Sequence, residues 1–227
     1  SMEQTDFEIG GRVVDRLTAT KVVASDFIDR RVGDRIGLIL FGRQAYLQAP
    51  LTFDRTTVKT LLNEAAIGLA GKETAIGDAI GLAVKRLRRS AEAEQVLVLL
   101  TDGANTAGSI EPMKAAELAA GEGLKIHTIG IGADQMTVRS LFGAHRVNPS
   151  LDLDEVTLQG IADLTGGRYF RARDTGELEE IYALLDRIEP VEQDPIQYRP
   201  RRELFHLPLA AALALAGIIA LPRRGAA

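Results

Sequence analysis

In this 227-residue sequence, an acidic residue stands just after a short apolar segment. Residues 95–100 are almost all branched aliphatic and lead into Thr101-Asp102-Gly103. A continuous apolar run of this length predicts a strand buried on both faces, which places Asp102 at the carboxyl end of that strand. A charge in this position needs a counter-ion or a metal ion. The alternative is an Asp that caps a turn or a helix.

Two hydroxyl groups are further candidates for the same chemistry. Thr74 lies in the segment 71–79, which contains Gly71 and Gly77 and leads into a predicted helix. Ser1 stands at the start of the chain, before a polar segment. Hydroxyl and carboxylate oxygens are hard ligands that suit Mg²⁺ or Mn²⁺. The alternatives are that Thr74 is a helix N-cap and that Ser1 is a cloning scar or a terminus without function.

Hydrophobic periodicity predicts the elements that must position these groups. Helices are expected at residues 15–31, 54–66, 75–90, 112–122, 153–165 and 175–188. Strands are expected at residues 35–41, 45–49, 95–100, 125–131 and 168–172, with the first two forming an antiparallel hairpin. Residues 3–12 and 133–152 are expected to be loops. This alternation predicts an α/β fold, a doubly wound and mostly parallel sheet flanked by helices, which binds ligands at the carboxyl ends of its strands.

Composition narrows the functional classes. Hydrophobic residues make up 46% of the chain, enough for a core, so intrinsic disorder is excluded. The absence of cysteine excludes disulfides, cysteine-ligated zinc and a cysteine nucleophile. A net charge of −4 without a basic stripe disfavours nucleic-acid binding.

Other catalytic motifs are incomplete. Gly68-Leu-Ala-Gly-Lys72 lacks the spacing of a phosphate-binding loop, and Gly130-Ile-Gly132 does not extend to a dinucleotide fingerprint. There is no Gly-x-Ser-x-Gly motif, and the three histidines are far apart, with His127 expected in the core. A metal-assisted hydrolase with Asp102 as a ligand stays an alternative, with Glu73 and Asp78 as the candidate bases.

The C-terminal part differs from the rest of the chain. Between residues 204 and 221 the only polar side chain is His206, and arginines flank the run on both sides. As a helix, this run would be about 27 Å long at about 1.5 Å per residue, close to the thickness of a bilayer core. We expect residues 1–188 to form a domain, 189–203 a linker, 204–221 a transmembrane helix and 222–227 a basic tail. The alternative for 204–221 is a buried core helix.

The order Ser1, Thr74, Asp102-Gly103 resembles the metal-ion-dependent adhesion site (MIDAS) of von Willebrand factor type A (VWA) domains. That site combines Asp-x-Ser-x-Ser after the first strand, a Thr in a later loop, and an Asp after the fourth strand. Thr74 and Asp102 match the last two, and Ser1-Met2 resembles the end of the first motif. The resemblance covers residues 1–188 and implies an N-terminally truncated domain that lacks its first strand.

Residues 27–31, 34–42, 46–52, 68–79 and 198–205 are similar more narrowly to BatA-type membrane proteins of bacterial aerotolerance operons. This resemblance implies a non-catalytic domain in which Ser1, Thr74 and Asp102 hold Mg²⁺ or Mn²⁺ and a partner protein supplies a further carboxylate. It also implies partnership with MoxR-type AAA+ ATPases and sibling VWA proteins at the bacterial inner membrane, with a periplasmic domain preferred. A structural membrane protein with an empty site is the remaining alternative.

Overall fold

The computed structural model describes residues 2–68, 70–71, 73–88, 95–140 and 143–190. Its helices are α1 (Arg16–Arg30), α2 (Arg55–Glu64), α3 (Ile76–Leu87), α4 (Pro112–Gly121), α5 (Glu155–Leu164) and α6 (Thr175–Ile188). Its strands are β1 (Phe7–Ile9), β2 (Arg12–Val14), β3 (Ile36–Phe41), β4 (Ala45–Thr52), β5 (Val96–Thr101), β6 (Lys125–Ile131), β7 (Met136–Ser140), β8 (Gly143–Val147) and β9 (Tyr169–Ala172). The six predicted helices and five predicted strands are all present, with bounds shifted by a few residues.

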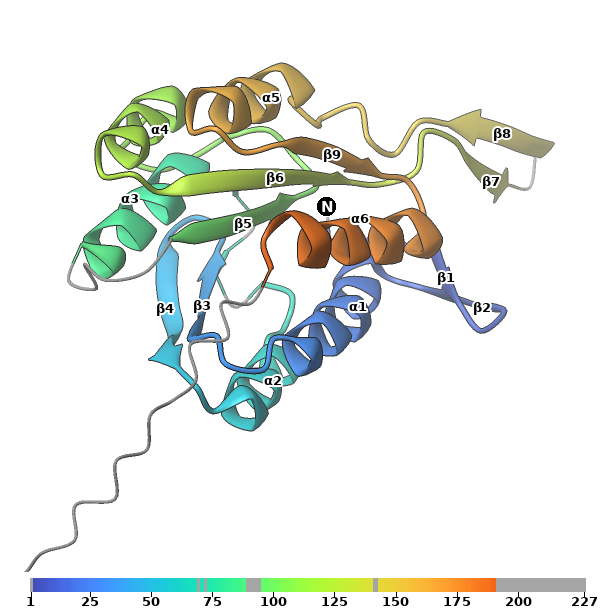
Figure 1. Cartoon of the computed structure of the whole chain (residues 1–227). Coiled ribbons are helices and arrows are strands. Elements are labelled where there is room, and N and C mark those ends of the chain that lie inside the picture. Colours follow the sequence, from blue (N-terminus) through green and yellow to red (C-terminus); the bar gives the residue numbers. More distant parts are fainter. Residues whose placement is uncertain (1, 69, 72, 89–94, 141–142, 191–227) are drawn as a thin grey trace, which may run out of the picture. The chain divides into compact units, whose positions relative to one another are not determined.

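A three-stranded parallel sheet lies at the centre of the described residues. Its order is β5-β6-β9, and helices α4 and α5 cover one face while α1 and α6 cover the other (Figure 1). Side chains of β6 alternate between two cores. Ile126 packs with residues of α3, α4 and α5, whereas Ile129 and Ile131 pack with residues of α1 and α6. The predicted parallel α/β architecture is therefore confirmed.

Strands β3 and β4 form an antiparallel hairpin, as their sequence predicts. Phe41 pairs with Ala45, and the hairpin turns at residues 42–44. Among the described residues this hairpin is a hydrogen-bonded pair of its own, separate from the β5-β6-β9 sheet. A third apolar cluster fills the space between the hairpin and helices α1 and α2, with Val58 and Ala49 at its centre.

Two segments predicted to be loops are β-hairpins instead. Within residues 3–12, Gly10 and Gly11 both have positive φ angles, 56° and 79°, which close a two-residue turn between β1 and β2. Within residues 133–152, β7 pairs with β8 from Met136–Val147 to Ser140–Gly143. The predictions were wrong because both hairpins have short strands that carry too few apolar residues to stand out in the sequence.

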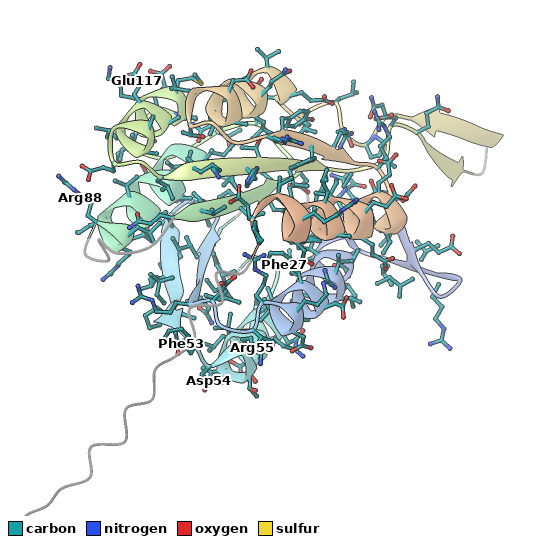
Figure 2. The ribbon with its side chains drawn as sticks, in the orientation of Figure 1. Phe27, Phe53, Asp54, Arg55, Arg88 and Glu117 are labelled. Atoms are coloured by element: carbon teal, nitrogen blue, oxygen red, sulfur yellow. The ribbon has the colours of Figure 1, made fainter. Side chains whose placement is uncertain are left out.

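Aspartates begin four of the helices. Asp15, Asp54, Asp154 and Asp174 each accept a hydrogen bond from the backbone N–H three residues on, which satisfies one of the free donors of a helix start. Asp54 stands at the start of α2, between Phe53 and Arg55 (Figure 2). The hydrogen bonds that Asp54 accepts from Thr57 hold the pKa of Asp54 below its usual value.

The described part of the chain contains no helix that is long and apolar enough to cross a membrane. The predicted helix at 204–221 and the basic tail at 222–227 lie outside the described residues, as does most of the predicted linker. The chain divides into two units after Glu192, and every described residue belongs to the first unit.

Candidate functional site

Asp102 lies at the carboxyl edge of the parallel sheet, as predicted. It follows the last residue of β5, and the neighbouring register pairs Thr101 with Gly130 near the end of β6. Its side chain is 4% exposed. The structure therefore places a carboxylate in a buried position, where its charge must be compensated.

The loop that carries Thr74 is attached to the loop that follows Asp102. The Thr74 carbonyl accepts hydrogen bonds from the N–H groups of Thr106 and Ala107, at 2.9 and 3.2 Å. The Thr74 N–H donates to the Thr106 hydroxyl at 2.9 Å. A Cβ atom built on Gly103 would lie 4.0 Å from Thr74 Oγ1. Two of the three predicted ligands, Thr74 and Asp102, are therefore brought to the same edge.

The Thr74 hydroxyl does not cap helix α3. The N-cap position belongs to Ala75, and the first helical N–H, that of Ile76, donates to Asn105 Oδ1 at 2.8 Å. Within the described part of the chain, the Thr74 hydroxyl makes no hydrogen bond. Asn105 therefore accepts the capping hydrogen bond of α3 that the alternative assigned to Thr74. The Thr74 hydroxyl is left available for a ligand.

Asp78 fixes the same loop from within α3. Its Oδ1 accepts hydrogen bonds from the N–H groups of Ser109 and Ile110, at 2.8 and 2.9 Å. Gly77 allows the close approach, because a Cβ there would lie 1.9 Å from the Ile110 carbonyl oxygen. The Asp78 carboxylate therefore has a structural role in holding residues 103–110 against the start of α3.

The counter-ion of Asp102 is Arg16, which the sequence did not indicate. Arg16 opens helix α1, and its side chain is fully buried. Its Nη1 donates to Asp102 Oδ2 at 3.3 Å, while its Nε and Nη2 donate to Asp6 at 2.6 to 3.0 Å. Burial opposes the charged guanidinium, but the hydrogen bonds and charge of Asp6, followed by those of Asp102, raise the pKa of Arg16 above its ordinary value.

The guanidinium is held on its remaining sides by the segment after β8. Arg16 Nη2 also donates to the Pro149 carbonyl at 3.3 Å and to Ser150 Oγ at 3.4 Å. Gly132 lies against both side chains, since a Cβ there would be 2.3 Å from Ser150 Oγ and 2.5 Å from Arg16 Nη2. A side chain at residue 132 would therefore displace Arg16.

These residues fit a cation better than an anion. Asp6, Arg16 and Asp102 carry two negative charges and one positive charge in a buried cluster, which leaves one surplus negative charge. Across the described ranges there is no group of three or more His, Asp or Glu side chains that could hold a metal. A metal at this edge would accordingly use hydroxyl groups beside Asp102.

The third predicted ligand, Ser1, lies outside the described residues. The first described residue, Met2, accepts a hydrogen bond from the Leu17 N–H at 3.3 Å. The described N-terminal residues therefore lie against the first turn of α1, which also carries Arg16.

A parallel sheet between two layers of helices, with a Thr and an Asp-Gly at its carboxyl edge, is the arrangement of a VWA domain. The von Willebrand factor type A domain model matches residues 1–184, and the chain belongs to this family. The predicted resemblance to VWA domains is thereby confirmed.

Bacterial proteins are among the relatives. A UPF0353 protein of Mycolicibacterium paratuberculosis is 29% identical over 188 residues, which cover 76% of this chain and 54% of that protein. An uncharacterized protein of Borreliella burgdorferi is 33% identical over 121 residues, or 53% of this chain and 36% of that protein. The chain thus spans from about a third to about half of the length of these relatives.

Several solved structures resemble this chain. BatB from Bacteroides thetaiotaomicron is 26% identical, with 83% of this chain and 93% of that chain covered at a TM-score of 0.66. An aerotolerance-related membrane protein from Bacteroides fragilis is also 26% identical, with 81% and 92% covered at a TM-score of 0.65. A mussel byssus matrix protein with a zinc-occupied MIDAS is 22% identical, with 77% and 40% covered at a TM-score of 0.61, a likeness of fold.

Proposed function

We propose that this VWA domain binds partner proteins through a divalent ion held at the Thr74–Asp102 edge. One observation carries the proposal. The Thr74 hydroxyl lies beside Asp102-Gly103, at a buried cluster with one surplus negative charge. Such a cluster attracts a cation, and the hydroxyl supplies a second hard oxygen next to the carboxylate.

The ion proposed is Mg²⁺ or Mn²⁺. Thr74 and Ser1 would ligate it directly, and Asp102 would do so directly or through water. Because hydroxyl groups carry no charge and Arg16 already compensates part of the Asp102 charge, the bound ion stays electrophilic. It can then accept a carboxylate oxygen from a partner protein as a further ligand.

Asp78 and Glu73 are the candidate bases of the hydrolase alternative. Their contacts in the structure support a non-catalytic role. Asp78 Oδ1 is occupied by two backbone N–H groups. Glu73 is 52% exposed and pairs with the exposed Arg43 at 3.4 Å. Both carboxylates are therefore engaged in contacts other than the activation of a water molecule.

Membrane attachment and partners form the wider part of the proposal. The apolar run at 204–221, flanked by arginines, would anchor the domain to the bacterial inner membrane, with the domain in the periplasm. The Bacteroides fragilis relative is described as a membrane protein, which agrees with such an anchor. The proposed partners are a MoxR-type AAA+ ATPase and sibling VWA proteins.

Metal binding is tested by titrating the full-length protein with MnCl₂ and MgCl₂ in a calorimeter after treatment with EDTA. We expect one divalent ion to bind and the Asp102→Ala variant to bind at least about tenfold more weakly, a change of about 1.4 kcal/mol. Asp163→Ala is the matched control, because it removes an exposed carboxylate near the C-terminal end of α5. Absence of binding by the wild type, or unchanged binding by Asp102→Ala, would overturn the proposal.

A further inference from the structure

Asp6 and Asp102 share the guanidinium of Arg16 unequally. Three donor–acceptor distances join Arg16 to Asp6, at 2.6, 2.9 and 3.0 Å, whereas the contact to Asp102 is 3.3 Å. The three side chains are 0 to 4% exposed, so little water screens them. The guanidinium is therefore bound more closely by Asp6 than by Asp102.

Asp6 is itself fixed at this position. Its Oδ2 also accepts the Ala133 N–H at 3.0 Å, from the turn that follows β6. Asp6 thus holds the guanidinium from a backbone anchor that does not involve Asp102. Without the Asp6 charge, the only carboxylate in this cluster left to Arg16 would be Asp102.

We propose that Asp6 raises the divalent-ion affinity of the Asp102 edge by competing with Asp102 for Arg16. Asp6 is a positioning residue in this role and does not ligate the ion. The inference rests on the proposed function, because it concerns the ion that Thr74 and Asp102 would hold. Its physical basis is the charge of the cluster, which is −1 with Asp6 present and 0 without it.

The test is a double-mutant cycle in the full-length protein, with Mn²⁺ affinity as the readout and the melting temperature of the metal-free protein as a control of folding. Asp6→Asn keeps the shape of the side chain and its acceptor for Ala133 but removes the charge. Arg16→Gln removes the guanidinium charge. The double variant removes both partners and restores a cluster charge of −1.

We expect Asp6→Asn to bind Mn²⁺ at least about tenfold more weakly than the wild type, because unit charges at these separations interact strongly in a buried site. The double variant is expected to return to within about threefold of the wild type. If Asp6 and Arg16 had only a structural role, the double variant would bind Mn²⁺ no better than Asp6→Asn does.

Two outcomes would overturn the inference alone: an Asp6→Asn affinity within about threefold of the wild type, or a double variant that stays weak. If Asp6→Asn does not fold, the double variant decides, because replacing both members of a buried ion pair is tolerated better than removing one. A wild type that binds no Mn²⁺ would overturn the proposed function together with this inference. If the wild type binds Mn²⁺ and Asp102→Ala loses that binding, the proposed function stands even when the inference about Asp6 fails.

Discussion

Nε2 of His127 lies 2.9 Å from Oε1 of Glu189, which ties strand β6 to the residue that ends helix α6. His127 Nδ1 accepts the Arg168 N–H at 3.1 Å, so in the neutral ring the proton lies on Nε2 and is donated to Glu189. Lys125 donates to both oxygens of the same carboxylate. The histidine predicted to be a core residue is 2% exposed, and it also anchors the end of the domain opposite the Asp102 edge.

Glu189→Gln should lower stability, with an effect that depends on pH. Burial alone would raise the pKa of Glu189, but the hydrogen bonds and charges of Lys125 and His127 outweigh it and lower this pKa below the ordinary value of 4.5. The ionised carboxylate therefore stabilises the fold above about pH 4.5, and this contribution is lost as the pH falls through the lower folded-state pKa. We expect a loss of about 1–3 kcal/mol at pH 7 in urea unfolding.

The matched control for this variant is Glu180→Gln, on the exposed face of α6. It should change the free energy of unfolding by less than about 0.5 kcal/mol. The difference between Glu189→Gln and the wild type should shrink as the pH approaches 3. A difference that is equally large at pH 3 and pH 7 would contradict the assigned role of the charge.

Thr74→Val should weaken metal binding without weakening the fold. Valine keeps the β-branched shape of threonine and removes only the hydroxyl, which makes no hydrogen bond in the described part of the chain. We expect Mn²⁺ affinity to fall at least about tenfold and the melting temperature of the metal-free protein to stay the same. Thr74→Ser keeps the hydroxyl and should bind Mn²⁺ within about threefold of the wild type, as long as the hydroxyl is a ligand. Equal affinities of the valine and serine variants would remove Thr74 from the proposed ligand set.

Gly77→Ala should destabilise the packing of α3 against the loop that ends at α4. The new methyl group would meet the Ile110 carbonyl oxygen at 1.9 Å, and a backbone atom cannot move aside like the end of a side chain. The expected cost is about 1–3 kcal/mol, measured by thermal or urea unfolding. Gly121→Ala is the control, because Gly121 is also helical and a Cβ there meets nothing within 4 Å. That control should be neutral or stabilising by up to about 1 kcal/mol, and an equal loss in both variants would refute the steric explanation.

The sequence alone determined the six helices, five of the strands and the position of Asp102. Strand β5 is a nearly continuous apolar run, and a strand that is buried on both faces needs such a run wherever it lies in the fold. The residue after β5 must therefore stand at the carboxyl edge of a parallel sheet. The hairpins β1–β2 and β7–β8 escaped prediction because short strands carry a weak periodic signal.

Only the tertiary structure decided what surrounds Asp102. Arg16 stands 86 residues before it, and an Arg at the start of an amphipathic helix is indistinguishable in sequence from a solvated one. Asn105 likewise gives no sign in the sequence that it caps the helix following Thr74. Local patterns record which face of an element is apolar. The pairing of buried charges depends instead on contacts between distant segments, which exist only once helices and sheet have packed together.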